Sequence, residues 1–352
     1  MQQNQLTLLN TKAGPLLAGG LSLFCLAAIV VFQGWIKQDD LWYFAWIMAF
    51  FINGPHFLIS YLLFYRLAGR RIYQEKNFIL PGIIIPLILL SVWTSAGIIN
   101  SALMMSSILY SMFVLVGWHY VKQGFGILMV HQSIRKIYFC QNELIFIRVC
   151  IYCLWIASFI SLFGGNSRSE QYWGMLYSIP AIPQIFVKIS QYTAIFGLIL
   201  LVVFFIWRKK NNINDSPTGL IGFFINYVWL LPTFKNPNFA LLIPMFHSLQ
   251  YLLFAGNVVS NIEQESNKNK AVHNSIFKWW GPAFILAALG FHFIPLYLDQ
   301  YIGAPSNFGN AQFYLIGFIL FINVHHYFID SVLWKRDSGL IRNYLKPQKN
   351  NR

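Results

Sequence analysis

Charged residues are what this sequence has least of. Only 10% of its 352 residues are Asp, Glu, Lys or Arg, whereas soluble domains carry roughly 25%. This scarcity excludes an ordinary water-soluble globular protein. Acids are the rarer sign, with 11 Asp and Glu against 25 Lys and Arg. Few carboxylates therefore remain for the mid-membrane sites that ion-coupled carriers use.

Cysteine is also rare, and its placement does not indicate a disulfide framework. The four cysteines, which lie in or beside apolar stretches, are Cys25, Cys140, Cys150 and Cys153. The segment CIYC at 150–153 has the spacing of a redox motif, but it lies within an apolar helix and lacks a βαβ setting. We interpret all four as small buried residues.

Apolar residues, in contrast, are abundant: 57% of the chain is hydrophobic and 18% is aromatic. Apolar runs of about twenty residues recur along it, each long enough to cross about 30 Å of hydrocarbon. The sequence therefore predicts an all-α fold, a polytopic transmembrane helical bundle with about ten spans. The expected spans are 14–36, 41–65, 78–97, 101–121, 144–164, 187–207, 219–233, 239–262, 277–298 and 311–334.

Lysine and arginine fall unevenly on the two sides of these spans. Twenty lie at the chain ends or in one set of alternate connections, four lie in the other set, and Arg148 lies within a helix. By the positive-inside rule, this distribution predicts that both termini are cytoplasmic. The net charge of +14 is then a topology signal, and no nucleic-acid partner is expected.

We expect a single integral membrane domain over 1–352, in the bacterial inner (cytoplasmic) membrane. Residues 1–13 form a polar N-terminal segment without a clear signal-peptide cleavage site, and 335–352 form a basic cytoplasmic tail. No internal repeat is visible.

Histidine is the polar residue that the expected spans retain. An ionisable side chain at membrane depth is costly and by default faces a bundle interior or a cavity. His56 and His325 each lie roughly 15 Å, and His247 roughly 24 Å, from the predicted cytoplasmic end of its helix. The histidines of four outside-to-inside helices could therefore meet near one level. The candidate metal ligands are His56, His119, His247, His325 and His326.

Imidazole suits Fe and Zn, and carboxylate and thiolate ligands are scarce here. Four imidazoles would leave Fe(II) charged and partly open, able to bind O₂, so Fe(II) is expected ahead of Zn or haem. Ligating histidines usually donate their second N–H to an outer partner. The candidates for that role are Asp330, Gln250, Tyr251, Gln123 and Asn53.

A single membrane histidine often only forms a hydrogen bond across helices. We interpret His131 and His292 in this way. Asp330 has a second interpretation, as an ion-pair partner of Lys335 or Arg336 near the membrane boundary. Pro55 is expected to kink the helix beside His56 and to free a carbonyl group.

Four segments resemble the bacteriorhodopsin-related (Brp/Blh) family of membrane enzymes, which cleave β-carotene centrally to retinal. GPHF at 54–57, WHYV at 118–121, FHSLQY at 246–251 and HHYFID at 325–330 occur in the family's order. The resemblance implies an iron-dependent dioxygenase that uses O₂ on a carotenoid. It also implies a specific ligand set: His56, His119, His247 and His325.

The chain departs from the family pattern at several positions. Phe57 stands in place of a Gly, and the Asp expected shortly after it is missing. Tyr251 replaces the second histidine of the third motif, Val324 replaces a Pro, and His326 is additional. The expected substrate class is therefore broader than carotenoids and includes isoprenoids and acyl lipids.

Three functions remain open on the sequence. The first is a membrane oxygenase with a histidine-ligated iron, which acts on an apolar lipid. The second is a haem-binding electron-transfer protein with histidine pairs as axial ligands. The third is a transporter, although only Asp330 is placed within a span and no inverted repeat is visible.

Overall fold

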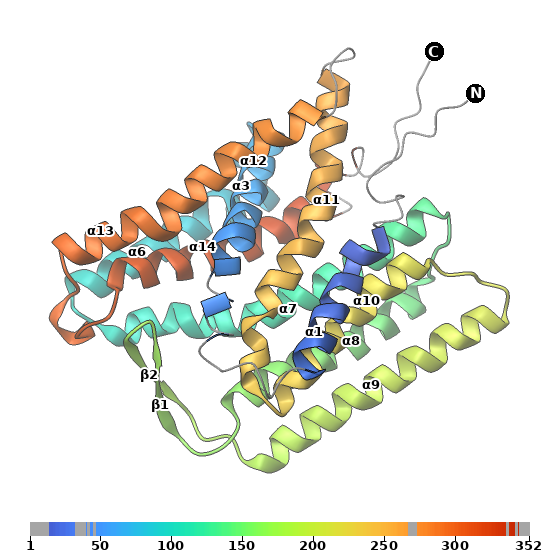
Figure 1. Cartoon of the computed structure of the whole chain (residues 1–352), viewed down its shortest axis with the longest axis horizontal. Coiled ribbons are helices and arrows are strands. Elements are labelled where there is room, and N and C mark those ends of the chain that lie inside the picture. Colours follow the sequence, from blue (N-terminus) through green and yellow to red (C-terminus); the bar gives the residue numbers. More distant parts are fainter. Residues whose placement is uncertain are drawn as a thin grey trace.

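The computed structural model describes residues 14–31, 40, 43–44, 47–266, 273–335, 338–341 and 344. Most of the described residues lie in long helices. In Figure 1, α7 runs through the middle of the molecule, with α8, α9 and α10 on one side and α6, α13 and α14 on the other. The helices are α1 (Leu21–Val31), α3 (Gly54–Ala68), α4 (Arg71–Gln74), α5 (Lys76–Ile79), α6 (Ile85–Ile98), α7 (Ala102–Ile134), α8 (Gln141–Phe163), α9 (Gln184–Lys210), α10 (Pro217–Leu230), α11 (Ile243–Ser266), α12 (His273–Ala288), α13 (Ile294–Tyr301) and α14 (Phe313–Leu333).

Eight helical segments in the described part of the chain are long and apolar enough to cross a bilayer, so the protein is an integral membrane protein. Their lipid-exposed faces are apolar: on α9, Phe196, Ile199 and Val203 are all more than half exposed. Two of the ten expected spans, 14–36 and 41–65, lie partly outside the described residues. The prediction of ten crossings and of cytoplasmic termini therefore stays a prediction.

The structure gives different bounds for two of the expected spans. The span expected at 219–233 is helical and continues past Pro232 as a 3₁₀ turn, Leu231–Phe234. The span expected at 101–121 is much longer, because α7 is one helix of 33 residues that reaches beyond His131. At 1.5 Å per residue it measures about 50 Å, longer than the hydrocarbon core is thick.

A short antiparallel hairpin, β1 (Arg168–Tyr172) and β2 (Met175–Ile179), was not expected from the sequence. Its turn residues Trp173 and Gly174 both have positive φ, 50° and 86°, as a two-residue type I′ turn requires. The all-α class still describes the fold, since the hairpin is its only sheet within the described residues.

One arginine is buried at the end of α9, where α8 and the connection to α10 meet. Arg208 is 1% exposed. It donates to Glu143 at 2.6 Å and to Asp215 at 3.0 Å, and its guanidinium lies 4.3 Å from the ring centroid of Phe139. The two carboxylates offset the cost of burying its charge, so this cluster joins three parts of the bundle.

We expect Gly124→Ala to destabilise the fold by about 1–3 kcal/mol through overpacking. A methyl group there would overlap the side-chain amide of the buried Asn226 on α10 and lie 3.3 Å from the carbonyl oxygen of Gly222. Gly126→Ala is the matched control in the same helix, because nothing lies within 4 Å of its added Cβ. Thermal unfolding in detergent should separate the two variants, and equal midpoints would contradict the close approach of α7 and α10.

Candidate metal centre

Four helices each contribute one histidine to a common point inside the bundle. His56 comes from α3, His119 from α7, His247 from α11 and His326 from α14. One ring nitrogen from each lies within 4.8 Å of those of the other three. All four side chains are at most 5% exposed. We call these four residues the histidine group.

The four rings form a closed circuit. The His56 ring centroid lies 5.0 Å from that of His247 and 4.6 Å from that of His326. The His119 centroid lies 4.8 Å and 4.9 Å from the same two rings. Each imidazole therefore has two imidazole neighbours, and the nitrogens converge on a shared centre.

Several nitrogens of the histidine group have no hydrogen-bond partner among the described residues, although they are fully enclosed. These atoms are Nε2 of His56, Nδ1 of His247, and both ring nitrogens of His326. A buried polar atom without a partner costs about 1–3 kcal/mol, so four of them in one place would be an expensive packing motif. A metal ion takes one lone pair from each imidazole, so it would remove this cost at Nε2 of His56 and at one nitrogen of His326.

The spacing of the nitrogens suits a metal ion as well. Nε2 of His119 and Nε2 of His247 are 3.1 Å apart. Two nitrogens bound to one ion at about 2.0–2.1 Å lie roughly 3.0–3.4 Å from each other when they are neighbouring ligands. This pair, which is also within hydrogen-bond distance, suits an ion as it stands, whereas nitrogens as much as 4.8 Å apart would have to move closer together to share one.

A carboxylate lies beside the histidine group without belonging to it. Oδ2 of Asp330 is 3.4 Å from Nε2 of His326 and 3.8 Å from Nε2 of His119. Oδ1 accepts a hydrogen bond from Ser60 at 3.0 Å, and Ser60 is also hydrogen-bonded to the hydroxyl of Tyr251. Asp330 therefore stands where an outer partner of a ligating histidine is found.

Tyr251 occupies the position where the resembling family has a histidine. Its ring centroid is 4.1 Å from that of His56, so the side chain at this position packs against the histidine group. On the other side of His56, Nδ1 is hydrogen-bonded to Ser248 at 2.6 Å. These contacts fix the orientation of the His56 ring and direct Nε2 towards the other imidazoles.

The two glutamines proposed as outer partners act on the backbone instead. Gln123 donates to the carbonyl of His247 at 3.1 Å and to Oε1 of Gln250 at 2.7 Å. Gln250 donates in turn to the carbonyls of Ala18 and Gly222, at 2.5 Å and 3.2 Å. They hold α7, α10, α11 and the segment before α1 together around the site. Oδ1 of Asn53, the fifth candidate, has no partner within the described residues.

His325 lies outside the histidine group, and both of its nitrogens are occupied. Nε2 is 2.7 Å from the carbonyl oxygen of Pro81, and Nδ1 is 2.6 Å from the hydroxyl of Tyr61. Because a carbonyl can only accept, Nε2 carries the proton and Nδ1 accepts from the tyrosine. In this structure the histidine that converges with the other three is His326, the residue that is additional to the family pattern.

The carbonyl that His325 binds is free because of a proline. Leu80–Ile84 is a π-helical turn, in which the N–H of Ile85 donates to Leu80. The next donor in that register would be Pro86, which has no N–H. The carbonyl of Pro81 is thus left without a backbone partner, and π-helical turns of this kind are frequent at functional sites.

The remaining predicted residues have other positions. His131 is buried in α7 against Phe254, at 5.9 Å between ring centroids, and is not part of the histidine group. His292 lies in a π-helical turn between α12 and α13 and is half-buried. Pro55 is the second residue of α3, which directly follows the π-helical turn Ala49–Asn53; the freed carbonyl stays a prediction.

Two serines near the site were missed by the sequence reasoning. Ser248 follows His247 directly, and Ser60 stands one helical turn after His56. The second spacing places both side chains on one face of α3. That spacing was the one indication in the sequence that Ser60 lies near the site, because serine is otherwise common in apolar helices.

We expect Asp330→Asn to weaken metal binding about 10–100-fold, as loss of an outer carboxylate partner typically does. The amide keeps the shape of the side chain but loses its negative charge. Competition against a chromophoric chelator measures the affinity in detergent. Asp40→Asn, the same exchange at an exposed position, is the control, and equal affinities in the two variants would argue against a role for Asp330.

Comparisons with known proteins add no relative: no family model, no curated protein and no solved structure matches this chain. Any assignment of function therefore rests on the site residues alone. The structure shows an integral membrane protein with a buried four-histidine group that is compatible with binding a metal ion.

Proposed function

We propose that this protein is a membrane-embedded oxygenase that holds a non-haem iron and acts on an apolar lipid, such as a carotenoid, an isoprenoid or an acyl lipid. The observation that carries the proposal is the convergence of four buried imidazoles, some of whose nitrogens lack partners. His56, His119, His247 and His326 would hold the ion. A bound Fe(II) would supply the activation of O₂, which protein side chains do not provide.

The chain's own residues orient the imidazoles. Ser248 fixes the His56 ring from one side and Tyr251 packs against it from the other. Oδ2 of Asp330 lies 3.4 Å from Nε2 of His326, and its charge would balance part of the positive charge of the site. A histidine held in one tautomer presents its lone pair without a cost of reorientation.

Aromatic side chains exclude water from the same site. Phe57 lies 4.8 Å from the His326 ring, Tyr120 lies 4.7 Å from the His247 ring, and Tyr327 lies 4.8 Å from the His119 ring. A dry, aromatic environment suits a long apolar substrate better than a polar one. The resemblance to the carotene-cleaving family supports the same class.

The geometry favours a single ion over haem. A haem iron with two axial histidines needs the macrocycle between them. The four nitrogens of the histidine group all lie within 4.8 Å of one another, which leaves no room for a porphyrin plane among them. For transport, no observation on the described residues favours a coupling site over the metal site.

The proposal is tested with detergent-purified protein loaded with Fe(II) under anaerobic conditions. We expect incorporation of isotope-labelled O₂ into β-carotene, a polyprenol or an unsaturated acyl lipid, detected by mass spectrometry. The reaction should be absent from His56→Ala and retained in Gly126→Ala. Iron-loaded protein that consumes no O₂ above the metal-free background with any of these substrates would contradict the oxygenase, and a Soret band would point to haem.

A further inference from the structure

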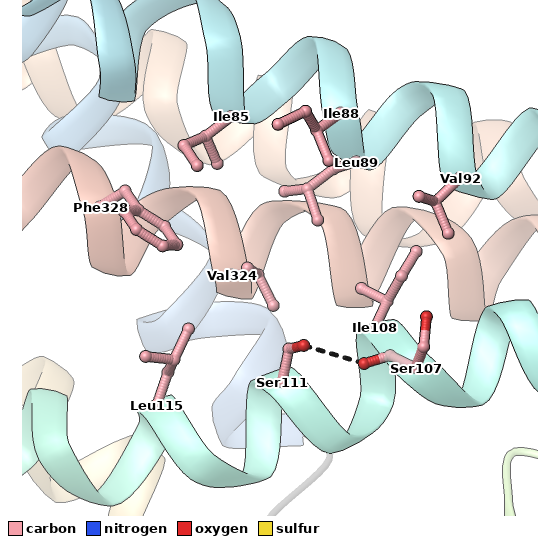
Figure 2. Close-up of a pocket in the computed structure, with 10 residues that line it drawn as sticks. All are labelled: Ile85, Ile88, Leu89, Val92, Ser107, Ile108, Ser111, Leu115, Val324 and Phe328. Atoms are coloured by element: carbon pink, nitrogen blue, oxygen red, sulfur yellow. Dashed lines mark hydrogen bonds between the residues drawn. The ribbon is translucent and has the colours of Figure 1, made fainter.

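Two cavities of different character meet at one side chain. The first has a volume of about 290 Å³ and lies between α6, α7 and α14. Figure 2 shows the apolar side chains of Leu89, Leu115 and Val324 around it, with only Ser107 and Ser111 as polar neighbours. Phe328 of α14 lines this cavity and also the second one. We call the first the apolar cavity.

The second cavity has a volume of about 410 Å³ and is strongly basic. It lies where α4, α5 and the π-helical turn Leu80–Ile84 approach α7 and the end of α14. We call it the cationic cavity. Its charged lining consists of four cations and one acid: Arg71, Lys76, Lys122, Lys335 and Glu75.

The one acid is already paired with the one arginine. Arg71 donates to both carboxylate oxygens of Glu75, at 2.7 Å and 3.0 Å. Within the described part of the chain, no ion pair joins Lys76, Lys122 or Lys335 to a carboxylate. Three like charges thus face a shared cavity, an arrangement that costs free energy unless an anion is bound.

Lys122 is the most informative of the three lysines. It belongs to α7, one of the apolar helices long enough to cross a bilayer, and is only partly exposed. Its Nζ lies 4.2 Å from the ring centroid of Trp118, which also lines the cationic cavity. Charged side chains on transmembrane helices face a cavity or a pathway by default.

We propose that the two cavities form one binding site for an anionic lipid. The phosphate of the headgroup would lie among Lys76, Lys122 and Lys335, and an acyl or prenyl chain would enter the apolar cavity past Phe328. The predicted topology places the cationic cavity on the cytoplasmic side, where basic pockets between transmembrane helices bind phosphate headgroups.

This site is separate from the histidine group. None of the residues that line either cavity belongs to His56, His119, His247 or His326. Lipid binding therefore does not depend on the proposed oxygenase activity. The metal content of each lysine variant distinguishes a failure of one proposal from a failure of the other.

The test places the full-length protein in phosphatidylcholine bilayers with and without a minority of phosphatidylglycerol, and counts retained phosphatidylglycerol by native mass spectrometry. We expect Lys122→Gln and Lys335→Gln each to weaken retention about fivefold, which corresponds to about 1 kcal/mol per lysine. Ser111→Phe, which fills the apolar cavity, should weaken it as well. Lys209→Gln is the matched control, since Lys209 is exposed at the end of α9 and outside both cavities.

Three outcomes would overturn the proposal. Equal losses in Lys122→Gln and Lys209→Gln would indicate general attraction of a basic surface. Inorganic phosphate that displaces the lipid fully, together with a Ser111→Phe variant that binds normally, would indicate a site for free phosphate. Equal retention of phosphatidylglycerol and phosphatidylcholine would show that the protein does not recognise the headgroup charge.

Discussion

Replacing His326 with alanine should abolish metal binding, whereas replacing its neighbour His325 should not. His326 belongs to the histidine group, and its two enclosed nitrogens have no hydrogen-bond partner in the described part of the chain. Both nitrogens of His325 are hydrogen-bonded, to Tyr61 and to Pro81. Structural zinc sites with four ligands release about 10–16 kcal/mol on binding in zinc-finger peptides. One ligand in four then accounts for roughly 3 kcal/mol, or more than a hundredfold in affinity.

The measurement is metal content by inductively coupled plasma mass spectrometry on protein purified in detergent without chelator. Wild type and His325→Ala should both carry about one ion per chain, and His326→Ala should fall to background. His131→Ala, at a buried histidine outside the group, controls for a general effect of removing an imidazole. The opposite pattern, with metal lost from His325→Ala and kept in His326→Ala, would restore the ligand set implied by the family resemblance.

Metal should also stabilise the bundle by several kcal/mol, because the four ligands come from α3, α7, α11 and α14. An ion that binds only the folded state contributes about 4 kcal/mol when its free concentration is a thousand times its dissociation constant. Stripping the ion with a chelator should therefore lower the thermal unfolding midpoint, and Fe(II) should restore it. Zn, whose nitrogen-ligand distances are similar, should restore stability without restoring oxygenase activity.

The control for this stabilisation is His326→Ala, which should show no shift on chelation or on addition of metal. If this variant and wild type shift equally, the ion binds elsewhere, for example at exposed carboxylates. If neither shifts, the four imidazoles form a metal-free hydrogen-bonded cluster, and the proposed function loses its basis.

The helical membrane architecture could be predicted because a bilayer core leaves the backbone few alternatives. Every carbonyl and N–H must find a partner without water, so each long apolar run becomes a helix. The same argument explains why the hairpin at Arg168–Ile179 was missed. It lies in a connection where water can satisfy the backbone, and its strands are too short for a strong alternating pattern.

Most of the histidine group could also be anticipated, since His56, His119 and His247 are each isolated imidazoles in apolar segments. The choice between His325 and His326 could not. Adjacent residues on a helix point about 100° apart, so the choice depends on the rotation of α14 against its neighbours. That rotation is tied to a carbonyl on Pro81, freed by Pro86 more than two hundred positions away in the chain.

The cationic cavity could not be predicted from the sequence, for a related reason. In the sequence, Lys76 and Lys122 fall in two separate expected connections and Lys335 in the expected tail, so their charge indicates only topology. Only the packing of α5, α7 and α14 brings them to one cavity. The distribution of charges along a sequence indicates which side of the membrane each connection faces. It does not indicate which charged side chains line the same cavity.

The distribution of the site along the chain sets an order in which it can be built during synthesis. His56, His119 and His247 are translated well before α14, and α14 carries both the fourth imidazole, His326, and the carboxylate of Asp330. A nascent chain that has inserted only as far as α11 can offer three histidines but neither the closing ligand nor its counter-charge. Metal capture at the histidine group would therefore require insertion of α14, and a chain truncated before this helix would lack both the fourth imidazole and its counter-charge.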